Sequence, residues 1–184
     1  MTERHVVEDA ATGVEAGSPS VESEPDPTGA LKRTFGTYPT GVTIVTTYGP
    51  DGPRGFTANS FTSVSIDPPL LLVCHSNHAS SHGVFSSASG FVVNVLAAEQ
   101  RELATRFASR IGDRFANLDF VDGHGGPIIP GAAAWLDCSM HDSHQAGDHS
   151  ILIGRVITHR ATTSDVLAYW RGSFVDGLET TGRS

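Results

Sequence analysis

The sequence predicts a mainly β, antiparallel domain, a barrel or a sandwich, with a few helices beside it. Three observations support this prediction. Short runs rich in β-branched and apolar residues outnumber segments with helical periodicity, turn sequences connect successive runs, and strands and helices do not alternate regularly as a parallel sheet requires. The 184 residues, 39% of them hydrophobic and 17% charged, have ordinary globular composition. A domain of this size buries roughly 70% of the surface of the unfolded chain.

The ends of the chain differ from its middle in composition. Residues 1–28 are rich in Glu, Ser, Pro and Gly, so we expect a disordered acidic tail before a domain at residues 29–176 and a flexible C-terminus at 177–184. The N-terminal stretch lacks the apolar core of a signal peptide, and no run approaches the ~20 apolar residues of a membrane span. We therefore predict a cytoplasmic protein that does not contact a membrane.

The first half of the domain contains clear strand and turn signals. A short helix is expected at Leu31–Tyr38, ending before Pro39. The alternating run Gly41–Gly49 is followed by the turn sequence PDGPRG, which predicts a hairpin. The apolar start of Leu70–Ser76 predicts a buried strand, and a short helix with a serine N-cap is expected from Ser80.

The second half begins with another predicted strand, Phe91–Ala97. The next segment, Glu99–Arg110, places Leu103 and Phe107 one turn apart and its arginines on the other faces, which indicates an amphipathic helix. A loop rich in Gly and Pro then precedes two long strand candidates, residues 133–144 and 149–161, on either side of QAGD. A third, short strand is expected within residues 166–172.

Charge and missing motifs exclude several function classes. The net charge of −8 argues against nucleic acid as a ligand, because binding to a phosphate backbone needs many clustered cations. Cys74 and Cys138 lie far apart without C-x-x-C spacing, so we expect buried thiols. The usual dinucleotide, P-loop, zincin and hydrolase motifs are absent, and Lys32 is the sole lysine, which disfavours Schiff-base chemistry.

Nine histidines are many for this length. The spacing of His75, His78 and His82 would place them on one face of a helix and suggests a metal site. However, the apolar run before His75 indicates that this residue ends a strand. We therefore predict no metal ligands and interpret most of the histidines as surface or supporting residues.

Two hydroxyl-rich segments are candidates for a binding site. The stretch Phe56–Pro69 carries short donors and acceptors that suit the edge of a flat polar heterocycle, although a strand with one solvated face explains them equally well. Cys74–Asn77, followed by serines at the predicted helix start, offers hydroxyl and N–H groups that can hold a phosphate. The arginines of Glu99–Arg110 either add positive charge there or face solvent.

Six segments carry a family resemblance in their order along the chain. They are GVTIVTT, GFTANSFTSVSIDPPLLLVC, FVVNVLAAEQRELATRFA, DRF, GAAAWLDC and AGDHSILIGRV. The ordered set, which covers about residues 31–174, resembles the flavin reductase family, small components that supply reduced flavin to two-component monooxygenases. The resemblance implies an FMN-binding split β-barrel, usually a homodimer, in which NADH or NADPH reduces FMN or FAD.

The resemblance also implies site residues. The flavin ring and ribityl chain are expected against Thr57, Ala58, Asn59 and Ser60. The ribityl and phosphate part is expected against Cys74, His75, Ser76, Ser80 and Ser81. His149, in the sequence G-D-H, is the candidate catalytic residue beside the nicotinamide, and Tyr169 and Arg171 are further candidates for the same pocket.

The sequence leaves several alternatives open. His149 could instead buttress a hairpin turn. The protein could bind flavin without turnover, hold a metal on its histidines, or use a tightly bound flavin to oxidise an organic substrate. The run CHSNHASSH contains more histidine than the family pattern predicts, and the acidic tail lies outside that pattern.

Overall fold

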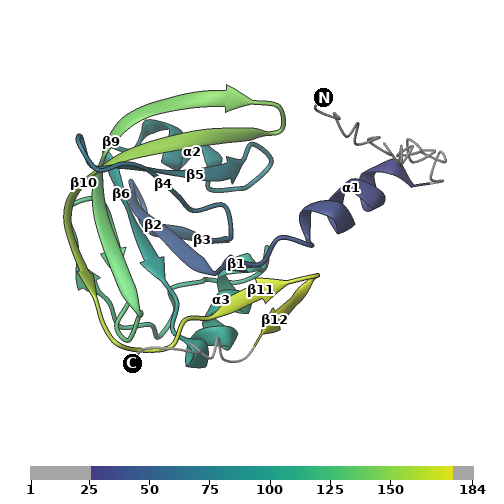
Figure 1. Cartoon of the computed structure of the whole chain (residues 1–184). Helices are drawn as coiled ribbons and strands as arrows, with labels where there is room; N and C mark the ends of the chain where they lie inside the picture. Colours follow the sequence, from purple (N-terminus) through teal and green to yellow (C-terminus); the bar gives the residue numbers. More distant parts are fainter. Residues whose placement is uncertain (1–25, 176–184) are drawn as a thin grey trace, which may run out of the picture.

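The computed structural model describes residues 26–175; the predicted C-terminal segment at 177–184 and most of the predicted tail lie outside this range. Its main feature is a seven-stranded antiparallel sheet in the order β3-β2-β6-β9-β10-β5-β4, accompanied by the small sheets β1-β11-β12 and β7-β8 (Figure 1). The strands are β1 (Thr40–Gly41), β2 (Thr43–Gly49), β3 (Gly52–Ala58), β4 (Thr62–Ser65), β5 (Leu70–Ser76), β6 (Gly90–Val95), β7 (Val121–Asp122), β8 (Pro127–Ile128), β9 (Ala134–Ala146), β10 (His149–Ala161), β11 (Ala168–Trp170) and β12 (Ser173–Val175).

Both predicted hairpins are present. β2 pairs with β3 through the PDGPRG turn, and the long strands β9 and β10 flank the turn at Gly147 and Asp148. β10 also pairs with β5, which places His149 opposite Ser76. The sequence predictions missed β12 and the short pair β7 and β8, which lies in the predicted Gly/Pro-rich loop, because strands of two or three residues carry almost no periodicity.

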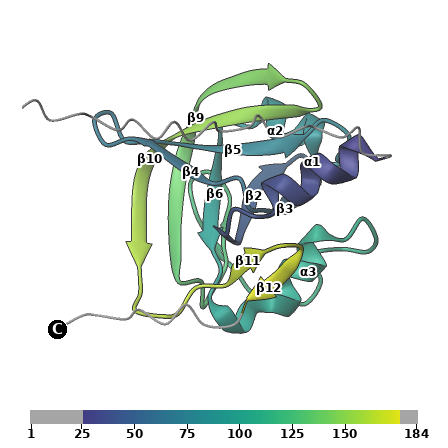
Figure 2. The same ribbon diagram turned by 45° about the vertical axis from the view of Figure 1, so that its right-hand side comes forward.

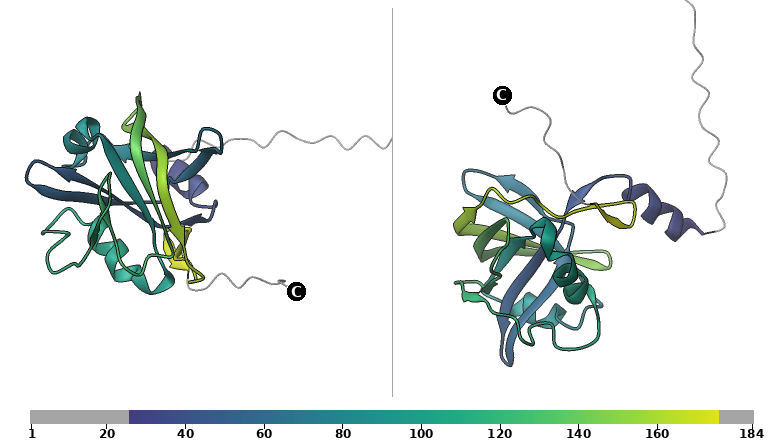
Figure 3. Two further views of the ribbon diagram at one scale, coloured as in Figure 1. Left: turned by 90° about the vertical axis from the view of Figure 1, so that its left-hand side faces the viewer. Right: turned by 90° about the horizontal axis from the view of Figure 1, so that it is seen from below.

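The helices partly follow the predictions. Helix α1 (Pro27–Phe35) begins earlier than predicted, inside the segment assigned to the tail, because the Asp26 carboxylate caps it by accepting from the Gly29 N–H at 3.0 Å. It has no buried residue, and Figures 1 and 3 show it projecting away from the strands. A 3-10 turn (Ala98–Gln100) leads into α3 (Arg101–Ala108), which confirms the predicted amphipathic helix.

Helix α2 (His82–Ser87) is also present, and a serine occupies its N-cap position as predicted, but the serine side chain does not cap the helix. Ser81 occupies the N-cap position without a side-chain hydrogen bond to the helix. Its hydroxyl lies 3.1 Å from Nε2 of His75 instead. The serine thus joins the helix start to β5 rather than capping the helix.

The core consists of two clusters on the main sheet. The first gathers around Val45, Phe85 and Phe91, and the second brings Phe107 of α3 against Ile44 and other buried aliphatic residues. Burial of each such side chain stabilises the fold by about 1.5–3 kcal/mol. Figure 2 shows α2 near one end of the sheet, and α3 with the β11–β12 hairpin near the other. Within residues 26–175, no helix has the length and apolar character needed to cross a membrane.

Candidate functional site

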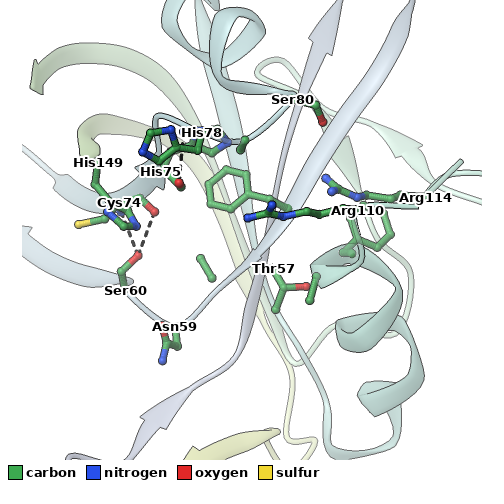
Figure 4. Close-up of a pocket in the computed structure, with 16 residues that line it drawn as sticks. Thr57, Asn59, Ser60, Cys74, His75, His78, Ser80, Arg110, Arg114 and His149 are labelled. Carbon is green, nitrogen blue, oxygen red and sulfur yellow. Dashed lines mark hydrogen bonds between the residues drawn. The ribbon is translucent and has the colours of Figure 1, made fainter. Parts of the chain in front are cut away.

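A cavity of about 410 Å³ lies where β3 and β5 end, beside the start of α2 and the segment after α3. We call it the central cavity. Figure 4 shows its labelled side chains, with His78 and His149 on one side and Arg110 and Arg114 on the other. The residues that line it are Phe56, Thr57, Ala58, Asn59, Ser60, Cys74, His75, Ser76, His78, Ala79, Ser80, Phe107, Ala108, Arg110, Arg114 and His149.

The hydroxyls of the Phe56–Pro69 stretch shape the wall of this cavity. Ser60 Oγ accepts from the Cys74 N–H at 2.9 Å and donates to the Cys74 carbonyl at 3.3 Å (Figure 4). Thr57 Oγ1 donates to the carbonyl of Ala104 at 2.6 Å and so fixes α3 against β3. Thr57 thus ties the end of β3 to α3, and Ser60 ties the segment after β3 to β5. The first role of both side chains is to position the cavity wall.

The turn between β9 and β10 places His149 at the cavity. Gly147 adopts a φ of 61°, which favours glycine, and Asn77 binds the turn through its N–H to the Asp148 carbonyl at 2.9 Å. His149 Nδ1 lies 2.8 Å from Asp148 Oδ1, and this hydrogen bond is the main reason that the pKa of Asp148 is lowered. Because an ionised carboxylate only accepts, Nδ1 carries the proton, and Nε2 is left for a ligand.

The opposite side of the cavity is cationic. The Arg114 guanidinium donates to the Gly55 carbonyl at 2.6 Å and twice to the Ser109 carbonyl, and burial lowers its pKa. Arg110, exposed at the cavity mouth, makes no hydrogen bond or ion pair with any residue in the range 26–175. A fixed cation and an unpaired one therefore meet at this end.

The arginines earlier in the predicted helix do not reach the cavity. The helix ends at Ala108, Arg106 donates to the carbonyls of Asp113 and Ala116, and Arg101 lies over the ring of Phe174. Arg110 and Arg114 come after the helix, where a loop returns the chain to β3. Positive charge in this segment was foreseen from the sequence, but the arginines that supply it follow the helix.

His75 contributes a neutral ring to the wall. It lies in β5, as its apolar flank predicted, and it is only 1% exposed. Its ring packs edge-on against Phe56 and is stacked on Phe85, and burial lowers its pKa to about 4. In the described part of the chain no three metal-ligating side chains stand close enough to hold an ion.

Most of the site residues implied by the resemblance meet in the central cavity, and three lie elsewhere. Ser81 lines an adjoining space instead. Tyr169 lines another cavity, of about 740 Å³, which shares Thr57 and Asn59 with the central one. Arg171 lies over the ring of Trp170, with its guanidinium 4.6 Å from the ring centre, and lines a separate hollow beside α1.

Several lining residues were not singled out from the sequence. Phe56 is the first residue of the hydroxyl-rich candidate stretch, but its ring and that of Phe107 show only the pattern of core residues. His78 was considered as one of the clustered histidines. Arg114 belongs to the segment DRF of the family resemblance, and it is also the last of the arginines that recur at 101, 106, 110 and 114 and indicate a place for a small anionic ligand.

Comparison with known proteins gives consistent relatives. A reductase subunit of stachydrine N-demethylase from Rhizobium meliloti is 45% identical over 147 residues, which cover 79% of this chain and 64% of the relative. A probable flavin reductase from the same organism is 47% identical, and the chain covers 47% of its length. The chain thus spans between about half and two thirds of these relatives.

Solved structures confirm the fold. The NADH:FAD oxidoreductase of Streptomyces globisporus, determined with NAD and FAD fragments, superposes with a TM-score of 0.81 at 40% identity, over 86% of this chain and 98% of that one. The flavin reductase PheA2 superposes with a TM-score of 0.78 at 30% identity, over 84% of this chain and 100% of that one. These similarities confirm the predicted split-barrel architecture. Residues 35–177 match the flavin reductase like domain, and the chain therefore belongs to the flavin reductase family.

Proposed function

We propose that this protein uses NADH or NADPH to reduce FMN or FAD and supplies the reduced flavin to a separate monooxygenase. The observation that carries the proposal is the central cavity, which has polar walls from β3 and β5, two arginines at one end and His149 at the other. The named activities of the relatives support it, among them an NADH-dependent FAD reductase and an FMN reductase that uses NADH.

The chemistry of the lining groups fits a flavin. Within the range 26–175, the side chains of Asn59, His78, Ser80 and Arg110 make no hydrogen bond, so they are available to a ligand. Asn59 and the adjoining backbone suit the polar edge of a flat ring, and Ser80 with the arginines suits a phosphate. Phe56 adds apolar surface that such a ring needs, and the fully buried Phe107 supports the cavity wall from behind.

The residues of the site would orient the reactants and shield them. A bound flavin and a nicotinamide supply the hydride transfer themselves. Arg110 and Arg114 neutralise phosphate charge at one end, while Asp148 holds the His149 ring so that Nε2 is free to orient the nicotinamide or to move a proton. The neutral His75 ring excludes water from the wall behind them, because it lies between Phe56 and Phe85.

Anaerobic mixing of the purified protein with each nicotinamide and each flavin tests the activity. We expect the visible absorbance of the flavin and the absorbance of the nicotinamide to fall together. If no pair reacts, the proposed activity is wrong, and flavin binding without oxidation of nicotinamide would identify a carrier instead. The flavin should also separate from the protein on dialysis, since a tightly retained yellow colour would contradict delivery to a partner.

We also propose that the protein is a cytoplasmic homodimer. The exposed side chains of helix α1 support the proposal of a dimer. Leu31 and Phe35 are 53% and 69% exposed, and Tyr38 just beyond the helix is 74% exposed. Three large apolar side chains on a projecting segment favour packing against another chain. Light scattering should give the mass of a dimer for the natural protein, and Phe35→Glu should shift it toward the monomer. A natural protein that is monomeric at all concentrations would contradict the proposal.

A further inference from the structure

A second cavity of about 380 Å³ lies beside the cationic end of the central cavity. Ser80, Arg110 and Arg114 line both cavities, so the two spaces adjoin at these residues. The second space is bounded on its own side by the β2–β3 hairpin and the segment after α3. We call it the arginine groove, and its own lining includes Pro53, Arg54, Asp113 and Phe115.

The cations of this groove have little internal compensation. Arg54 donates to the Pro53 carbonyl at 3.0 Å, and its contact with Asp51 is 3.9 Å long, to a side chain that is 87% exposed. The Arg114 guanidinium donates its hydrogen bonds to backbone carbonyls, and Arg110 has no partner in the range 26–175. Three guanidinium groups along one path favour a ligand with more than one phosphate, because each can form charge-assisted bonds to phosphate oxygens.

The remaining walls favour a nucleoside over a bare polyphosphate. Pro53 and the half-buried Phe115 also line the groove, and Phe115 is held edge-on against Phe107 and Phe120, so the part of these two side chains that faces the groove offers apolar surface to a flat base. Asp113 also lines the groove, and its carboxylate accepts from the Phe115 N–H at 2.9 Å. A carboxylate repels a simple polyanion but accepts hydrogen bonds from sugar hydroxyls or a base amino group. Cation, aromatic ring and acceptor together match an adenosine attached to phosphate.

We propose that the arginine groove holds the second phosphate and the adenosine of FAD, and that Arg54 makes this chain prefer FAD to FMN; this rests on the proposed function. FMN ends at its phosphate, which Ser80, Arg110 and Arg114 hold where the cavities join. Arg54 lines the groove and not the central cavity, so only the longer dinucleotide reaches it. The phosphates of FAD would lie at Ser80, Arg110 and Arg114, between the two cavities. The nicotinamide would instead stack on the flavin ring in the central cavity.

Calorimetric titration of FAD and of FMN, without nicotinamide, tests this assignment. We expect the natural protein to bind FAD at least about tenfold more tightly than FMN. Arg54→Ala should weaken FAD binding about tenfold and leave FMN within about twofold, and Arg54→Lys should restore part of the loss. The matched control is Arg155→Ala, since Arg155 is exposed on β10 and lines neither cavity; it should change neither affinity.

The outcomes separate the two proposals. Equal affinities for FAD and FMN in the natural protein, or an equal loss of both in Arg54→Ala, would overturn the assignment of the groove while flavin reduction still stands. A rise in KM for NADH or NADPH alone in Arg54→Ala would assign the groove to the nicotinamide cofactor and also overturn it. If neither flavin binds to the natural protein, the proposed function itself is wrong. Circular dichroism spectra that match the natural protein verify that each variant is folded.

Discussion

Nε2 of His75 lies 3.1 Å from Oγ of Ser81, so the end of β5 is joined to the residue that precedes α2. A second hydrogen bond, of 3.0 Å between His82 Nε2 and Ser150 Oγ, joins the start of α2 to β10. The two histidine rings are stacked, with centroids 5.9 Å apart. Two of the three histidines whose spacing suggested a metal site, His75 and His82, therefore connect β5, α2 and β10 near the central cavity.

The protein should become less stable as the pH falls, because His75 stays neutral in the folded state. Burial lowers its pKa from the ordinary value of 6.5 to about 4, so between these values the unfolded chain binds a proton that the folded chain does not. The free energy of unfolding should lose up to about 3 kcal/mol from this group as the pH falls from 6.5 to 4. Urea unfolding across this range should show a smaller loss for His75→Phe. Identical pH dependence in the two proteins would show that His75 does not contribute.

His149 should affect turnover more than flavin binding. His149→Ala removes the ring beside the proposed nicotinamide position, so we expect kcat/KM for the nicotinamide to fall about tenfold or more, with the flavin Kd within about twofold. Asp148→Asn should lower kcat/KM for the nicotinamide by a smaller factor. A neutral amide oxygen accepts the hydrogen bond from His149 Nδ1 less strongly than a carboxylate does, so the ring is held less firmly. Steady-state kinetics measure both effects. Unchanged kcat and KM in His149→Ala would show that the histidine only supports the turn.

Ser60 should matter through the contact it makes with β5. Ser60→Ala removes the acceptor of the Cys74 N–H, and we expect a stability loss of about 1 kcal/mol and weaker flavin binding. Ser60→Trp should reduce flavin affinity about tenfold or more by filling the cavity. Thr62→Ala is the matched control, because Thr62 is exposed on β4 and does not line the cavity. A flavin Kd that Ser60→Trp leaves unchanged would remove this loop from the site.

Gly55 should tolerate no side chain. A Cβ at this position would lie 2.7 Å from Phe107 Cε1 and 3.1 Å from the Val45 carbonyl oxygen, and Phe107 is fully buried. Gly55→Ala should therefore lower the free energy of unfolding by about 1–3 kcal/mol, and flavin binding should weaken because Phe107 lines the cavity. Gly41→Ala is the control, since a Cβ there meets no atom within 4 Å. Equal urea midpoints for the two variants would contradict this account of the packing.

The sequence was informative wherever a local pattern sufficed. Alternation in Gly41–Gly49 and the apolar start of Leu70–Ser76 marked strands that the structure contains. The early start of α1 at Pro27 was missed, because its capping residue, Asp26, lies in a segment whose composition resembles a disordered tail. Local patterns report which face of a segment is buried, but they do not report the partner that it meets.

By itself the sequence determined the main strands, their antiparallel class, the turn that carries His149 and the family to which the chain belongs. Only the tertiary structure decided which side chains share a cavity. The pairing of β5 with β10 set His149 beside Ser76, the loop after α3 returned Arg110 and Arg114 to β3, and Arg171 went elsewhere. The physical reason is that these contacts depend on strand register and on loop closure between residues far apart in the chain. The periodicity within one segment does not encode either of them.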